Sequence, residues 1–191
     1  MPYRVMIDRV RELCVPGRVD EARAGVLKRH AALVEQRDDH MRDELAEGCP
    51  TALDAMAMVQ RGEACDPRWS FQLVYGVELL CRYWGWLEKN AAFSPTRWDA
   101  LEELSGALAK RMRPEPLSLL LYRGSPVEIA VPLPDIPAVG YLRAEEIKDH
   151  LARFPGSDEL PRAERAAVDQ LRSWLANCVA TYERDLVVFT Y

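Results

Sequence analysis

An apolar stretch over residues 69–87, WSFQLVYGVELLCRYWGWL, constrains the fold of this chain more than any other feature. Wound as an α-helix, this stretch is apolar on nearly every side, and it contains three of the chain's five tryptophans. A helix that is apolar all round is buried in a core. The sequence therefore predicts a central helix over residues 69–87, with one hydrophobic core formed around it.

The first and last segments of the chain are predicted strands. Tyr3, Val5 and Ile7 alternate with residues of the opposite face, and the closing run DLVVFTY is rich in β-branched and aromatic residues. A third, short strand is expected over residues 138–142. Helical signals fill most of the rest, so the expected class is α+β, a helix-dominated domain with a small sheet built from the N-terminal, C-terminal and one internal strand.

The length of 191 residues and the hydrophobic fraction of 49% are expected for a single domain over residues 1–191. Six of the 13 prolines fall in residues 114–137. Because proline blocks helix formation, we expect this segment to be a long ordered loop, irregular apart from the apolar run LSLLLY. Long ordered loops carry function more often than core elements do.

Several residue types that cap helices indicate where helices begin. Asp20, Thr51, Asp66 and Ser94 each precede an apolar helical pattern. By contrast, the run EQRDDHMRDE at residues 35–44 is charged throughout. It is expected to be a solvated helix end or an exposed connection.

Charge and hydropathy exclude several classes of protein. The net charge is −5 and acidic and basic residues alternate, so there is no segregated basic face for nucleic acid. The opening residues lack the pattern of a signal peptide, and no stretch reaches the length of a membrane span. Five scattered cysteines are expected to be free thiols in a reducing cytosol, which predicts a cytoplasmic protein.

The sequence contains none of the common catalytic or metal-binding spacings. The three histidines, at positions 30, 40 and 150, do not share an i, i+4 spacing, and no cysteines stand in a Cys-x-x-Cys pair. A nucleophile elbow and a glycine-rich phosphate loop are missing as well. No catalytic residue, metal ligand or cofactor is therefore expected. His30, Cys81 and Cys178 are expected to be core residues.

One polar stripe on the predicted central helix is the candidate site. Tyr75, Glu78, Arg82 and Trp86 are spaced by three and four residues and so share a helix face. They form either a surface Glu–Arg pair or the floor of a recognition site, where the aromatic rings and the guanidinium provide rigid contacts. Three residues near the Pro-rich loop would complete such a pocket: Tyr122, Arg123 and Tyr141.

Three segments, YGVELLCRYWGWLE, IPAVGYLRAEEI and DLVVFTY, resemble an uncharacterised bacterial family with a domain of unknown function. Members share a leading strand, an apolar helix, a Pro-rich loop, a Gly-Tyr-Leu step into a helix and a closing aromatic strand. The resemblance implies a bacterial cytosolic setting and a single α+β domain. It implies no activity.

Two hypotheses about function remain open. In the first, the protein is a non-catalytic module that docks on another protein, for example an immunity-type protein that neutralises a basic toxin, which the acidic balance would suit. In the second, it is a small-ligand binder or an enzyme with a pocket between the central helix and the Pro-rich loop. An open convex stripe would favour docking, whereas a concave stripe with Glu78 buried beside Arg82 would favour the pocket. The oligomeric state is left open.

Overall fold

The computed structural model describes residues 1–93, 98–133, 137–156, 162–180 and 183–191. Short 3₁₀ turns at Pro16–Arg18 and Pro67–Trp69 precede two of the helices. The remaining elements, in chain order, are β1 (Pro2–Val5), α1 (Ile7–Leu13), α2 (Val19–His40), α3 (Arg42–Ala46), α4 (Ala52–Arg61), α5 (Ser70–Trp84), β2 (Trp86–Leu87), α6 (Trp98–Ala109), α7 (Pro116–Tyr122), β3 (Ala138–Leu142), α8 (Ala144–Arg153), α9 (Arg162–Ala180) and β4 (Asp185–Thr190).

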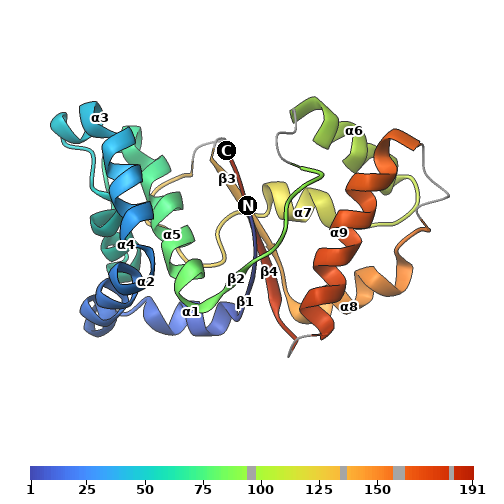
Figure 1. Ribbon diagram of the computed structural model, residues 1–191, viewed down its shortest axis with the longest axis horizontal. Helices are drawn as coiled ribbons and strands as arrows, with labels where there is room; N and C mark the ends of the chain where they lie inside the picture. Colours follow the sequence, from blue (N-terminus) through green and yellow to red (C-terminus); the bar gives the residue numbers. More distant parts are fainter. Residues whose placement is uncertain (94–97, 134–136, 157–161, 181–182) are drawn as a thin grey trace.

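Within the described residues, four strands form one antiparallel sheet in the order β2-β1-β4-β3. The two terminal strands are neighbours, with Tyr3 opposite Val187. Helices α1 to α5 cover one face and α6 to α9 cover the other (Figure 1). The class is therefore α+β, and the strands predicted at both ends and over residues 138–142 are confirmed. Strand β2 is an addition that the sequence does not predict.

Both faces of the sheet are buried, which divides the core in two. Val187 and Phe189 of β4 contact the α1–α5 layer, whereas Leu186 and Val188 contact the α6–α9 layer. A strand that is buried on both faces has apolar residues in succession rather than in alternation. This explains the run LVVF in the last strand.

The prediction of one core around a central helix is wrong. Helix α5 belongs to one layer and packs against α4, where a Cβ on Gly76 would lie 2.7 Å from the backbone nitrogen of Met56. No described residue of α5 belongs to the second core. The sheet lies at the centre of the molecule because both its faces are apolar, and each face is covered by its own layer of helices.

The predicted helix over residues 69–87 is also wrong at its C-terminal end. Helix α5 ends at Trp84, and Gly85 has an extended backbone with φ −115° and ψ 174°. Trp86 and Leu87 then pair with β1, with Trp86 opposite Arg4. A Cβ at Gly85 would lie 2.5 Å from a methyl carbon of Val5, so only glycine allows the chain to turn this close to β1.

Strand β1 is shorter than predicted, because Ile7 begins helix α1 instead of extending the strand. The carboxylate of Asp185 accepts hydrogen bonds from the backbone N–H groups of Ile7 (2.7 Å) and Ala144 (3.0 Å). Asp185 therefore caps the N-termini of α1 and α8 together, which no local pattern reveals.

The predicted helix starts have mixed outcomes. Thr51 caps α4 as expected, since its hydroxyl accepts a hydrogen bond from the N–H of Asp54. Asp66 caps the 3₁₀ turn that leads into α5. Asp20 is not a cap, because α2 already begins at Val19. Ser94 lies outside the described residues.

Part of the Pro-rich segment is helical, because LSLLLY lies within α7. Pro116 occupies the first turn of that helix, where its missing N–H is not needed, and Glu115 caps it. Beyond α7, Val127 is buried in the core of the α1–α5 layer, and Ile129 and Val131 pack against that core.

The thiols behave as the sequence predicts. The five cysteines are free, and Cys81 and Cys178 are buried. Burial raises the pKa of the Cys178 thiol to about 12, so it stays protonated at neutral pH. Among the helices that the structure describes, none has the length and hydropathy to cross a bilayer.

Candidate functional site

A buried carboxylate with an unusual number of donors lies in the middle of α5. The side chain of Glu78 is 0% exposed. One oxygen, Oε1, accepts hydrogen bonds from the hydroxyl of Tyr3 and from Nε and Nη2 of Arg82, the last two at 3.2 and 3.1 Å. The other, Oε2, accepts from Arg37 and from the hydroxyl of Tyr191. We call these five residues the Glu78 cluster.

The Glu78 cluster joins segments that are far apart in the sequence. Arg82 lies one turn after Glu78 on α5, whereas Arg37 comes from the last turn of α2. Tyr3 belongs to β1, and Tyr191 follows β4. The pairing of β1 with β4 brings both tyrosines to the same carboxylate. The cluster therefore forms only when α2, α5 and the terminal strands are assembled.

The electrostatics of the cluster leave it with a net positive charge. Burial alone would raise the pKa of Glu78, but Arg37, the hydroxyls of Tyr191 and Tyr3, and Arg82 outweigh it and hold that pKa below its ordinary value. Burial and the nearby carboxylate raise the pKa of both phenols, so they stay neutral. One carboxylate therefore faces two guanidinium groups.

A pocket of about 390 Å³ lies directly beside the cluster. We call it the Tyr75 pocket, and its described lining residues are Met1, Leu33, Gln36, Arg37, His40, Met41, Tyr75 and Tyr191. The rings of Tyr75 and Tyr191 are stacked with centroids 5.5 Å apart. The guanidinium of Arg37 lies 4.6 Å from the centroid of the Tyr75 ring. Two aromatic rings and one cation are thus in mutual contact at the pocket wall.

Arg37 uses only part of its hydrogen-bonding capacity within the cluster. Its Nη1 donates to the backbone carbonyl of Tyr75 at 3.3 Å, and its Nη2 donates to Glu78 and to the hydroxyl of Tyr191. A guanidinium has five N–H donors. Within the described residues, these contacts use three of them and leave two.

The structure brings three of the four stripe residues together and separates the fourth. Glu78 and Arg82 belong to the cluster, and Tyr75 lines the adjoining pocket. Trp86 is 53% exposed in β2, and its ring lies 4.8 Å from the guanidinium carbon of Arg184. The helical spacing fails for Trp86 because α5 ends two residues before it.

Two of the three residues predicted near the Pro-rich loop, Arg123 and Tyr141, contact each other in a different group. The guanidinium carbon of Arg123 lies 4.2 Å from the centroid of the Tyr141 ring, and Arg123 forms an ion pair with Glu146 at 2.5 Å. Tyr122 is 57% exposed. None of them is among the described residues of the Tyr75 pocket, which lies between α2 and α5.

Sequence reasoning missed Arg37 and Tyr191. Arg37 lies in the charged run expected to be solvated, yet its side chain is only 13% exposed. A signal was present, because Arg37 follows Leu33 and Val34 by four and three residues and so shares their inward helix face. Tyr191 gives no local signal, since only the pairing of the terminal strands places it at Glu78.

A family model described as "Domain of unknown function (DUF7691)" matches residues 1–191. The chain belongs to the DUF7691 family. This confirms the predicted resemblance to an uncharacterised family. No curated protein and no solved structure matches the chain.

In this DUF7691 chain, no group of three or more histidine, cysteine or acidic residues among the described residues is arranged to hold a metal ion. His30 fits its prediction as a satisfied core residue only in part. It lies half-buried at a kink in α2 and its ring makes a hydrogen bond with the backbone of Arg82, whereas its Nε2 has no hydrogen-bond partner in the described part of the chain.

Proposed function

We propose that the protein is a non-catalytic binding protein and that its ligand occupies the Tyr75 pocket. One observation carries this proposal. Arg37 is held by a buried carboxylate and stacked on an aromatic ring at the wall of a pocket of about 390 Å³. Fixing a guanidinium in advance lowers the entropy that binding would otherwise cost.

The pairing of Glu78 supports binding rather than catalysis. A general base must reach the proton that it removes. Glu78 is fully buried, both its oxygens already accept hydrogen bonds, and it is not among the pocket-lining residues. Its role in this proposal is to hold Arg37 in place.

The pocket lining suggests the chemistry of the ligand. The net positive charge of the Glu78 cluster and the two remaining donors of Arg37 suit an anionic group, such as a carboxylate. The apolar side chains of Leu33 and Met41 suit an aromatic or aliphatic body.

Calorimetric titration with phenylacetate and with its neutral counterpart, 2-phenylacetamide, tests this proposal. Phenylacetate is expected to bind about tenfold more tightly, because its charged group pairs with Arg37. Met41→Trp fills the pocket and should abolish binding. Leu27→Trp, at an exposed position of α2 (41% exposed), is the matched control and should bind normally. Equal affinity for the two compounds, or binding unaffected by Met41→Trp, would refute the proposal.

A second candidate function is docking on another protein. The observation that favours it is a group of exposed apolar side chains where α5 passes into β2: Trp84, Trp86 and Leu87. Tryptophan is enriched in the residues that dominate protein interfaces. The net charge of −5 suits a basic partner, and a toxin neutralised in a bacterial cytoplasm is one version of this candidate.

Affinity capture with the full chain separates the two candidates. If the protein docks through this surface, Trp86→Ala loses a protein that the wild type retains from a lysate of its source cells, while Met41→Trp retains it. If the wild type and Trp86→Ala capture the same proteins, this surface is excluded as a docking site.

A further inference from the structure

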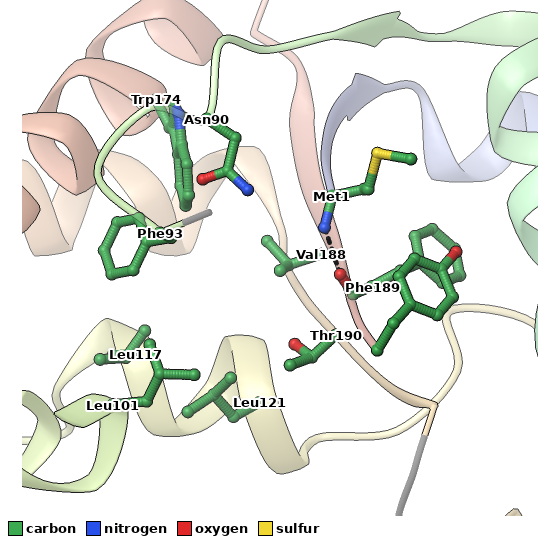
Figure 2. Close-up of a pocket in the computed structure, with 11 residues that line it drawn as sticks. Met1, Asn90, Phe93, Leu101, Leu117, Leu121, Trp174, Val188, Phe189 and Thr190 are labelled. Carbon is green, nitrogen blue, oxygen red and sulfur yellow. Dashed lines mark hydrogen bonds between the residues drawn. The ribbon is translucent and has the colours of Figure 1, made fainter. Parts of the chain in front are cut away.

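A second pocket lies on the other side of the C-terminal strand, in the layer formed by α6 to α9. Its volume is about 320 Å³. Figure 2 shows apolar side chains from α6, α7, α9 and β4 around an open space, with Asn90 and Phe93 from the segment after β2. We call this space the Asn90 pocket.

The walls of the Asn90 pocket are rigid and apolar. The indole N–H of Trp174 donates to the backbone carbonyl of Lys89 at 2.7 Å, so the ring is fixed and its polar atom is satisfied. Phe93 lies against Trp174 with ring centroids 5.0 Å apart. Leu117 and Leu121 stand one turn apart on α7 and form the opposite wall (Figure 2).

One polar atom in this pocket is left without a partner. The carboxamide oxygen of Asn90 is buried, and no hydrogen bond to it is made by any residue that the structure describes. Figure 2 shows the carboxamide extending into the space beside Trp174 and Val188. A buried, unpaired carbonyl is unfavourable, and buried polar groups are nearly always hydrogen-bonded. The observation points to a donor supplied by a bound molecule.

We propose that the Asn90 pocket binds a small uncharged amphiphile, with an apolar body and one amide or hydroxyl group that donates a hydrogen bond to Asn90. This site is additional to the Tyr75 pocket and does not depend on it, although Met1 and Tyr191 line both.

The charge preference of the two pockets differs. None of the described side chains that line the Asn90 pocket is ionised at neutral pH, whereas Arg37 lines the Tyr75 pocket. The α-amino group of Met1 also lines the Asn90 pocket, where it donates to the backbone carbonyl of Phe189, and burial lowers its pKa to about 6, so it is mostly neutral at pH 7. Moving an ionised carboxylate into an apolar space without a paired charge is strongly unfavourable. The Asn90 pocket therefore selects the neutral member of a pair of ligands that differ only in charge.

Calorimetric titration of the full chain with octanamide and with octanoate tests the proposal. Octanamide is expected to bind, and octanoate at least tenfold more weakly. Asn90→Leu keeps a similar volume but removes the acceptor, so octanamide should bind it about three- to tenfold more weakly. Leu121→Trp fills the pocket and should abolish binding, while Tyr122→Ala, the exposed neighbour on α7, should leave it unchanged.

Several results would overturn the proposal. The first is that octanamide does not bind, and the second is that octanoate binds as tightly as octanamide. The third is that Asn90→Leu or Leu121→Trp binds octanamide as tightly as the wild type does. If Leu121→Trp does not fold, as judged by circular dichroism, Leu101→Trp fills the same space from α6 and replaces it. Met41→Trp, which fills the Tyr75 pocket, should still bind octanamide. Loss of octanamide binding in this variant would mean that the ligand occupies the Tyr75 pocket, which would also overturn the proposal.

Discussion

Arg37 in the last turn of α2 donates a hydrogen bond to the buried carboxylate of Glu78, which lies 41 residues later in α5. This contact helps to fix α2 against α5 and holds the guanidinium of Arg37 at the wall of the Tyr75 pocket. Glu78 is paired in the same way with the terminal strands through Tyr3 and Tyr191. The carboxylate therefore links the fold and the candidate site.

Replacing Glu78 with Gln is expected to lower the free energy of unfolding by about 3 kcal/mol, because two largely buried guanidinium groups lose their counter-charge. Urea denaturation followed by circular dichroism measures this change. Glu21→Gln is the matched control: Glu21 pairs with Arg18 on the surface, and its loss should change stability by less than about 0.5 kcal/mol. If the two variants lower the free energy of unfolding by similar amounts, Glu78 does not hold a buried cluster together.

The same carboxylate predicts an acid dependence of stability. The pKa of Glu78 is lower in the folded protein than its ordinary value of 4.5, so its contribution is fully present above that value. The contribution is lost as the pH falls below about 4.5 and through the folded pKa. Urea midpoints measured from pH 7 to pH 3 should therefore fall less steeply for Glu78→Gln than for the wild type, and parallel curves would be inconsistent with this account.

Two glycines in helices offer a test of how closely α5 packs on α4. Gly76→Ala should destabilise the protein by more than about 1 kcal/mol, although alanine favours helix, because the added Cβ would lie 2.7 Å from the backbone nitrogen of Met56. Gly106→Ala in α6 meets open space and should stabilise it by about 0.5–1 kcal/mol. Thermal melting of both variants measures these opposite shifts. Stabilisation by both would mean that α4 and α5 are not in close contact.

The sequence predicts elements whose signals are local. The terminal strand, the strand over residues 138–142 and the Thr51 cap follow from residue types within a few positions of each other. The same local reasoning places Trp86 on a helix, because nothing within residues 69–87 reveals that β1 will pair with them.

The candidate site was only partly predictable for a related reason. Tyr75, Glu78 and Arg82 lie within two turns of one helix, so their spacing brings them together in the sequence pattern. Arg37 and Tyr191 reach Glu78 only through the packing of α2 on α5 and the pairing of the terminal strands. These contacts depend on tertiary structure, and the charged neighbours of Arg37 conceal its inward position.

A crystal structure of the protein with phenylacetate tests the central claim most directly, because it shows where the ligand lies and which donors it uses. The account predicts the phenyl ring between α2 and α5 beside Tyr75, with the carboxylate within hydrogen-bonding distance of Arg37. Phenylacetate bound elsewhere, or in this pocket with its carboxylate turned away from Arg37, would contradict it.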